Sequence, residues 1–356
     1  MQGHSYNPAE RFLHYLALAS KPVAEFSFDL NAVLQSRGPR PKVDGRHVFV
    51  SGLARAGTTI IMRRLYETGD FRSLTYRDMP FVLCPSLWQR ISASAQRDAQ
   101  AAERAHGDRL NVDFDSPEAL DEVFWRVFAG SLYIKDDYLC VHAADTDLIE
   151  KFRRYVSYIL DAQGPADRRS RYLSKNNNNI LRLDAIRSAF PGGTIIIPFR
   201  DPIQHANSLL QQHIRFSQLQ HDDKFIRSYM SWLAHHEFGL AHKPFRFERR
   251  GQSEASSHEA TDVSYWLERW LEAYAWLLAN RPDTSILVCY EDLCGDPSIW
   301  NRLLERLELD THGTTSTTTL VRSTDKDVPG VDANLAAASR TLYGELRSSS
   351  ELSRGS

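Results

Sequence analysis

The 356-residue chain has few cysteines, little net charge and no long apolar run, and each shortage excludes a class of protein. Four cysteines without a C-x-x-C pair do not make a disulfide framework, so we expect reduced thiols in a cytoplasmic enzyme. A formal net charge of −2 provides no overall field for nucleic acid, so any anion site must be local. No run of 18 apolar residues is present, which argues against a membrane span.

The N-terminal segment Phe12–Ala19 ends in Ala-Leu-Ala and faintly resembles a signal-peptide cleavage site. Glu10 and Arg11 precede it and His14 interrupts it. An amphipathic helix that begins near Pro8 explains the segment better.

Three short apolar runs, at residues 47–51, 194–199 and 285–290, indicate buried strands. They do not alternate with polar residues, which is typical of a parallel sheet covered on both faces. Helices are expected at residues 58–68, at 145–162, at 180–190 and from 202 to about 212, with further helical stretches between 89 and 125. The sequence therefore predicts an α/β fold, a P-loop-like, doubly wound parallel sheet flanked by helices, with a helical insertion on the acceptor side.

Three regions follow from this pattern. Residues 1–45 form a helical extension, residues 46–322 form the main domain, and residues 323–356 form a loop and helix. Within the main domain, residues 213–262 interrupt the α/β pattern with aromatic, histidine-rich and polar stretches. This insertion is a candidate lid over an acceptor site, or equally a helical covering.

A glycine loop follows the first predicted strand and reads Gly52-Leu-Ala-Arg-Ala-Gly-Thr-Thr59. Backbone N–H groups at the start of the next helix would bind an anion there. Nucleotide triphosphatases carry lysine at the position of Thr58, so the loop argues against hydrolysis of ATP or GTP. Arg55 places a positive charge inside the loop instead.

The segment Arg55-Ala56-Gly57-Thr58-Thr59 resembles the 5'-phosphosulfate loop of sulfotransferases that use 3'-phosphoadenosine 5'-phosphosulfate (PAPS). Its arginine is more like that of tyrosylprotein sulfotransferases and their bacterial relatives than the lysine of the cytosolic enzymes. A second match is Arg200-Asp201-Pro202 with Ser208, which has the eight-residue spacing of the family's 3'-phosphate site. An arginine at a strand end and a serine about two turns along the next helix can both reach one phosphate.

Two weaker matches complete the resemblance. Lys175 is similar to the lysine that contacts the sulfuryl group in this family, and Tyr290-Glu291-Asp292-Leu293 is similar to the segment that closes the last core strand. Lys326 lies in a segment that resembles the cofactor-covering loop of the tyrosylprotein enzymes.

The resemblance implies a transfer of a sulfuryl group from PAPS to an acceptor hydroxyl, with adenosine 3',5'-bisphosphate as the product. Arg55 and residues 56–59 would hold the 5'-phosphate, and Lys175 would contact the sulfuryl oxygens. Arg200 and Ser208 would bind the 3'-phosphate, with Tyr290 and Lys326 as further contacts. No metal is required, because arginine and lysine neutralise the charge.

The identity of the base is less well defined by the sequence. Asp78 resembles in position the catalytic glutamate of the tyrosylprotein enzymes, but an ion pair with Arg77 or another arginine is an equal alternative. His205 and His213, eight residues apart on the helix after Arg200, are the rival bases.

The acceptor remains open among small-molecule, carbohydrate, lipid and peptide hydroxyls, and the oligomeric state cannot be deduced. A P-loop kinase of small molecules and a nucleotide-binding protein without catalysis are the alternative functions. A kinase predicts a magnesium requirement, and the missing lysine argues against it.

Overall fold

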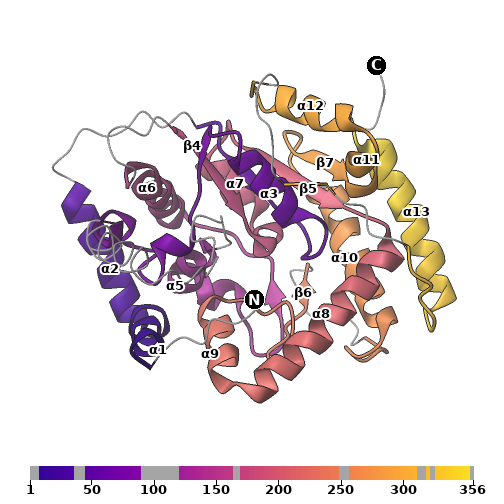
Figure 1. The fold of residues 1–356 in the computed structure, drawn as a ribbon, viewed down its shortest axis with the longest axis horizontal. Coiled ribbons are helices and arrows are strands. Elements are labelled where there is room, and N and C mark those ends of the chain that lie inside the picture. The colour runs from indigo at the N-terminus through magenta and orange to yellow at the C-terminus, as the bar shows by residue number, and fades with distance from the viewer. Residues whose placement is uncertain are drawn as a thin grey trace, which may run out of the picture.

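The computed structural model describes residues 8–35, 45–89, 120–162, 169–247, 256–310, 318–320 and 325–352. Five strands form a parallel sheet in the order β2-β4-β1-β5-β7 (Figure 1). Their bounds are β1 Val48–Val50, β2 Phe71–Arg72, β4 Arg171–Lys175, β5 Thr194–Phe199 and β7 Ile286–Cys289. A separate parallel pair joins β3 Leu139–Cys140 to β6 Phe245–Arg246. The predicted α/β class with a central parallel sheet is confirmed.

Alternate residues of β1, β5 and β7 enter two different cores, as the two-residue period of a strand requires. Phe49, Ile197 and Leu287 belong to the larger core, whereas Val48, Ile196 and Val288 belong to the smaller one. Both faces of the sheet are therefore covered, which explains why the strand sequences lack polar alternation.

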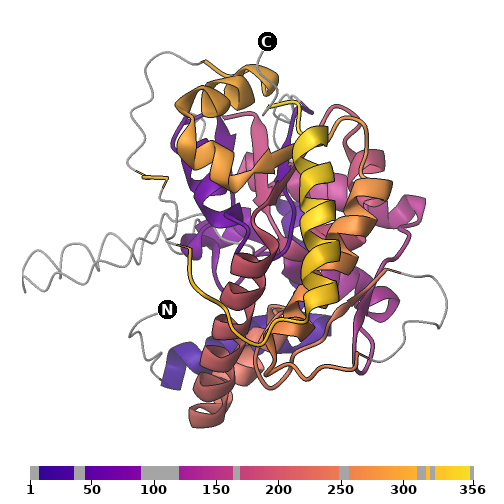
Figure 2. The same ribbon diagram turned by 90° about the vertical axis from the view of Figure 1, so that its right-hand side faces the viewer.

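The smaller core is closed by α3 Thr58–Tyr66, α11 Tyr290–Gly295 and α12 Pro297–Arg306. The larger core extends over α5 Glu122–Tyr133, α6 Thr146–Asp161, α7 Leu183–Ala189, α8 Pro202–Asp222, α9 Lys224–Trp232, α10 Val263–Asn280 and α13 Ala333–Ser349. Helix α6 contacts β4 and α13 contacts β7, and Figure 1 shows α6 to the left of the sheet and α13 to its right. Figure 2 shows the yellow α13 beside the orange α10, which it contacts directly.

Several predicted helices differ in extent. The N-terminal helix is α1 Pro8–His14 followed by a π-helical turn at Tyr15–Ala19, and α2 Lys21–Gln35 comes after it. The helix predicted for residues 202–212 continues to Asp222, so residue 213 lies inside α8. The stretch predicted as helical from residue 90 to 119 lies outside the described residues.

The helix predicted for residues 180–190 is wrong at its start. A 3-10 turn covers Asn177–Leu181, and α7 begins only at Leu183. Between them Arg182 adopts an extended φ of −145° and its Nη2 pairs with buried Glu122 at 2.9 Å. Its guanidinium also lies 4.6 Å from the Trp125 ring centre, so tertiary contacts hold Arg182 out of the helix.

Candidate functional site

The residues predicted to bind the donor follow the carboxyl ends of four neighbouring strands. Val50, the last residue of β1, is in register with Lys175 of β4 and Ile196 of β5. Phe199, before Arg200, is in register with Cys289, before Tyr290. Parallel strands end at one edge of the sheet, so the glycine loop and the predicted residues gather there.

Two unusual backbone conformations shape the glycine loop. Arg55 has φ +70° and Gly57 has φ +90°, both in the left-handed region. A Cβ on Gly57 would lie 2.4 Å from Cδ2 of Tyr290, so the aromatic ring packs directly on the glycine. The helix α3 then begins at Thr58, which is buried, while Thr59 is half-buried. Tyr290 therefore supports the loop, and only glycine fits at position 57.

His205 holds the same loop from α8. Its Nε2 lies 2.7 Å from the Ala54 carbonyl oxygen, and the side chain is fully buried. Burial is the main cause that lowers the pKa of His205 to about 3, and the nearby charges of Arg200 and Arg55 add to it. A neutral imidazole that donates to a loop carbonyl is a structural support, so these contacts do not favour His205 as a base.

Arg55 reaches across to α8, where its Nε donates to Ser208 Oγ at 3.2 Å. Partial burial lowers the pKa of Arg55, and the positive charges of Arg200 and Arg215 lower it further. Residues from the loop, from the end of β5 and from α8 thus form one cationic cluster. Such a cluster of like charges fits a multiply charged anion that would neutralise it.

The turn that carries Arg200 is held by Glu291 from the Tyr290–Leu293 segment. Glu291 Oε1 accepts a hydrogen bond from the Asp201 backbone N–H at 3.0 Å and lies 4.0 Å from Arg200 Nε. The hydroxyl of Tyr343 donates to Glu291 Oε2 at 3.1 Å. The motif noted in the sequence therefore includes a support for the arginine, a role that sequence reasoning did not assign.

Lys175 and Lys326 belong to two different segments of the chain. Lys175 ends β4, and the next N–H, of Asn176, donates to Val50 O at 3.1 Å beside the glycine loop. The backbone of Lys326 makes two hydrogen bonds with the side chain of Gln204 in the first turn of α8, at 2.8 and 3.0 Å.

Asp78 is 1% exposed and forms an ion pair, the alternative to a catalytic role. Its partner is Arg72 rather than Arg77. Arg72 Nη2 lies 2.7 Å from Asp78 Oδ1, and the Thr75 N–H donates to Asp78 Oδ2 at 2.8 Å. The role of Asp78 as base stays a prediction, and these contacts favour a structural role. His213 is likewise engaged, because its Nδ1 accepts from the Gly239 N–H at 3.3 Å.

A mostly apolar pocket adjoins the glycine loop, with about 460 Å³ of empty space that includes solvent at its mouth. Its lining comes from the loop, α8, α10 and the segment before β6: Leu53, Ala54, Leu209, Glu237, Phe238, His242, Lys243, Pro244, Phe245, Trp266 and Arg269. The predicted insertion thus contributes most of one wall. Trp266, expected as part of a core stripe with Trp270 and Tyr274, is buried and also borders this pocket.

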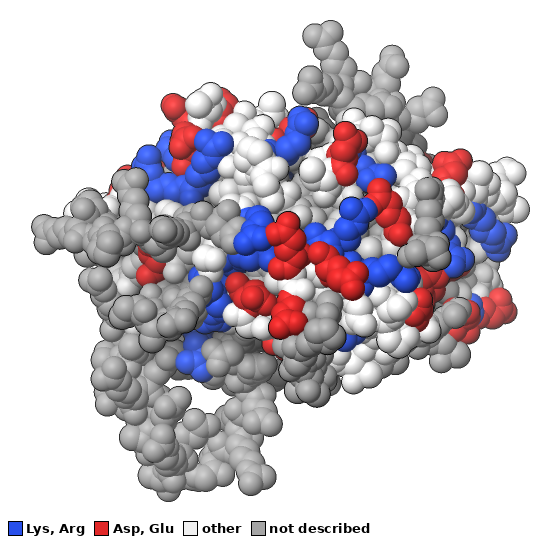
Figure 3. All heavy atoms as spheres, turned by 90° about the horizontal axis from the view of Figure 1, so that it is seen from above, with Lys and Arg blue, Asp and Glu red and all other residues white. Residues whose placement is uncertain are grey.

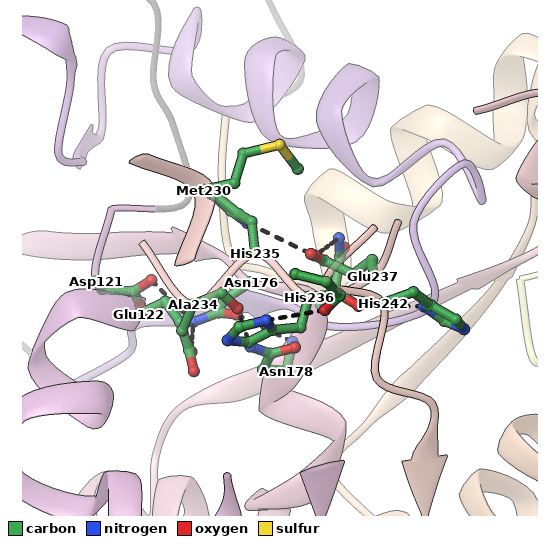
Figure 4. Close-up of polar contacts among 12 residues, drawn as sticks. Asp121, Glu122, Asn176, Asn178, Met230, Ala234, His235, His236, Glu237 and His242 are labelled. Carbon is green, nitrogen blue, oxygen red and sulfur yellow. Dashed lines mark hydrogen bonds and ion pairs between the residues drawn. The ribbon is translucent and has the colours of Figure 1, made fainter. Parts of the chain in front are cut away.

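Sequence reasoning did not identify Glu237. Figure 4 shows Glu237 with His235 and His236 beside Asn176 and Asn178 from the end of β4. Glu237 Oε2 lies 3.6 Å from His235 Nδ1, and its Oε1 accepts from Asn177 Nδ2 at 2.9 Å. The run His235-His236-Glu237, with a carboxylate two residues after a histidine, was the available signal.

Within the ranges given above, no group of three or more His, Cys, Asp or Glu side chains is placed to hold a metal ion. No helix in the described part of the chain is long and apolar enough to cross a membrane. Figure 3 shows one face, on which lysines and arginines alternate with acidic residues among the coloured atoms.

Comparisons with solved structures found bacterial sulfotransferases, all at low identity. STF9 from Mycobacterium avium is 15% identical with a TM-score of 0.45, over 97% of this chain and 79% of that one. STF1 from Mycobacterium tuberculosis H37Rv is 14% identical with a TM-score of 0.44, over 96% of this chain and 84% of that one. A sulfotransferase from Alicyclobacillus acidocaldarius is 12% identical with a TM-score of 0.40, over 85% and 94% of the two chains.

A search of curated proteins found no match. The model of the sulfotransferase family, however, matches residues 47–244, which is more than half of the chain. That range begins at β1, contains the glycine loop, Lys175 and Ser208, and ends at the pocket residue Pro244. The chain therefore belongs to the sulfotransferase family.

Proposed function

We propose that this transferase uses PAPS as its donor and passes the sulfuryl group in line to an acceptor hydroxyl. The hydrogen bond between Arg55 Nε and Ser208 Oγ carries the proposal, because it joins the residue expected at the 5'-phosphate to one expected at the 3'-phosphate. A nucleotide with phosphates at both positions matches a cationic site of this extent better than one with a single phosphate group.

Each predicted residue would bind the part of the donor that lies nearest to it. The backbone of residues 56–59 and Arg55 would hold the 5'-phosphate, and Lys175 at the end of β4 would contact the sulfuryl oxygens. Arg200 and Ser208 would bind the 3'-phosphate. Tyr290 supports the glycine loop. The Lys326 segment, which is hydrogen-bonded to Gln204 in the first turn of α8, would cover the nucleotide. Transfer needs alignment and charge compensation above all, and fixed cations on strand ends supply both.

The test is a comparison of nucleotides by thermal or chemical unfolding. Adenosine 3',5'-bisphosphate at 100 times its Kd should stabilise the protein by about 2.7 kcal/mol, because it binds only the folded state. At the same concentration, AMP, ADP and ATP, with or without magnesium, should stabilise the protein much less. A preference for ATP with magnesium would replace the proposal with a kinase.

Variants of two arginines sharpen this comparison. Arg200→Ala should remove most of the preference for the bisphosphate over AMP, since it removes a contact expected only at the 3'-phosphate. Arg187→Ala is the matched control, because Arg187 is 60% exposed and pairs with the exposed Asp184. An unchanged preference in Arg200→Ala would disprove the assignment of the 3'-phosphate site.

A further inference from the structure

The acceptor side of the site shows a carboxylate at the border between the apolar pocket and the donor residues. Glu237 lines the pocket together with Leu53 and Ala54 of the glycine loop. Its partner Asn177 lies two residues after Lys175, so one short turn links the carboxylate to the predicted sulfuryl contact. A hydroxyl held in this pocket would meet Glu237 on one side and the glycine loop on another.

The asparagine run after Lys175 fixes the position of this segment. Asn177 Nδ2 donates to Glu237, and Asn178 Nδ2 donates to the Ala234 carbonyl at 3.3 Å. Asn176 is itself fixed, because its Nδ2 donates to Asp121 Oδ1 at 3.1 Å and to Glu122 Oε2 at 2.6 Å. These buried amides hold the carboxylate in one place, as a catalytic group requires.

The charge state of Glu237 fits a proton acceptor. Burial would raise the pKa of Glu237, but the adjacent His235 and the hydrogen bond from Asn177 lower it to about 2. Burial would likewise lower the pKa of His235, but Glu237 more than offsets this, so that pKa lies above its ordinary value. The two pKa shifts favour the imidazolium form of His235 and the carboxylate form of Glu237, and the carboxylate is ionised at neutral pH.

The charged side chains of Lys243 and Arg269 also line the pocket and already have protein partners, although Arg269 Nε makes no hydrogen bond to any described residue. Lys243 Nζ donates to the Asp136 carbonyl at 2.7 Å, and Arg269 Nη2 pairs with Glu268 and Glu272 at 3.1 and 2.9 Å. His242 Nε2 lies 2.9 Å from the Tyr265 hydroxyl. The rest of the lining is largely aliphatic and aromatic, which suits an uncharged, mostly apolar acceptor.

We propose that Glu237 is the base for an uncharged, largely apolar hydroxyl compound bound in this pocket, and that Asn177 and His235 position it. The inference rests on the proposed function. The acceptor oxygen forms a bond to sulfur while the bond from sulfur to the bridging phosphate oxygen breaks. The hydroxyl proton passes to Glu237, and the bisphosphate leaves with the electron pair of the broken bond. A weak base suffices, because a loose transition state requires orientation of the hydroxyl more than its prior ionisation.

The experiment measures transfer from ³⁵S-labelled PAPS to 2-naphthol, phenol and benzyl alcohol, with wild type and variants. Glu237→Gln keeps an oxygen for Asn177 but loses the charge, so kcat should fall about 10²–10⁴-fold. The KM for PAPS and the stabilisation by the bisphosphate should not change. Glu237→Asp, which retains a carboxylate, should recover part of the lost rate. The control is Glu259→Gln, since Glu259 is exposed and lies outside the pocket lining.

The outcomes separate the inference from the proposed function. If the wild type binds the bisphosphate but neither binds nor sulfates any of the three probes, the acceptor class is wrong and the donor assignment survives. If Glu237→Gln retains kcat within tenfold, Glu237 is not the base. If Glu237→Gln unfolds, Asn177→Ala serves in its place, and an unchanged kcat there overturns the positioning role. Failure of the wild type to bind the bisphosphate would reject the proposed function itself.

Discussion

At the scale of the residue, the site depends on side chains that support others rather than on the charged groups alone. Tyr290 packs on Gly57, His205 holds the Ala54 carbonyl, and Glu291 holds the turn at Asp201. Tyr290 and Glu291 come from α11, and His205 comes from α8. The geometry of the glycine loop is therefore a property of the packed molecule.

Gly57→Ala should lower stability and nucleotide affinity more than the same change at Gly69. An alanine at φ +90° costs about 1–2 kcal/mol in backbone strain, and its Cβ would also collide with the Tyr290 ring. Gly69→Ala is the control, because Gly69 has φ +83° but nothing within 4 Å of the added Cβ. Urea unfolding and calorimetric titration with adenosine 3',5'-bisphosphate should show a larger loss in both stability and affinity for Gly57→Ala. Equal losses in the two variants would contradict the packing argument.

Asp78→Asn should lower stability rather than the chemical rate. The side chains of Asp78 and Arg72 are 1% and 6% exposed, and breaking a buried pair typically costs about 3–5 kcal/mol. The measurement is the free energy of unfolding together with kcat per folded molecule, with the exposed Asp184→Asn as control. A stable Asp78→Asn variant with kcat lowered by about 10²-fold or more would restore Asp78 as the base.

At the scale of the element, α8 organises the donor side. Asp201 caps its N-terminus by accepting from the Gln204 N–H at 2.9 Å, and Pro202 occupies its first turn. Gln204, His205 and Ser208 then contact the Lys326 segment, the glycine loop and Arg55. One helix thus connects two chain segments that are far apart in the sequence, the glycine loop and the Lys326 segment.

Gln204→Ala should release the Lys326 segment. It removes two hydrogen bonds, each worth about 1 kcal/mol, so affinity for the bisphosphate should fall by about tenfold or more if this segment covers the nucleotide. Hydrogen exchange of residues 325–331 should also become faster. Gln218→Ala on the same helix should change neither quantity, because the Gln218 amide donates to Asp222 one turn further along α8. Unchanged exchange in Gln204→Ala would show that other contacts hold the segment.

The elements themselves were predictable to different degrees. The strands at residues 48–50, 194–199 and 286–289 were found because a buried parallel strand is a short continuous apolar run. Strand β4, Arg171–Lys175, was noticed only as a motif, since its two ends are charged. The false helix start at Ile180 came from a local pattern that the buried pair of Arg182 with Glu122 overrides.

At the scale of the whole molecule, several histidines are buried without charge. Burial lowers the pKa of His142 and of His205 to about 3 and that of His242 to about 4. Each pKa lies below the ordinary value of 6.5, so each histidine contributes stability above pH 6.5 that is lost as the pH falls toward its folded pKa. Burial raises the pKa of Asp121 to about 6, which acts in the opposite direction.

Unfolding free energies should therefore fall between pH 6 and pH 4.5. The three histidines and Asp121 alone contribute a net difference of about two protons, or about 2.7 kcal/mol per pH unit near pH 5. His205→Gln should reduce this slope by about 1.4 kcal/mol per pH unit, whereas His221→Gln, at a side chain 78% exposed, should not. Urea titrations at half-unit pH steps would measure both slopes. An identical slope in His205→Gln and the wild type would mean that His205 is charged in the folded protein.

The sequence by itself determined the fold class and predicted the donor residues, because both depend on local patterns. Apolar runs mark the strands. The predicted donor residues Arg55, Arg200 and Ser208 come shortly after two of these runs in the sequence, and the strand ends position them. The tertiary structure alone decided what lies on the acceptor side. Glu237 and Asn177 are 60 residues apart, and Asp78 and Glu237 are both carboxylates whose difference lies in their partners, Arg72 for one and His235 for the other. Burial and long-range pairing set the pKa of a carboxylate and therefore its role, and neither can be deduced from the residues next to it in the sequence.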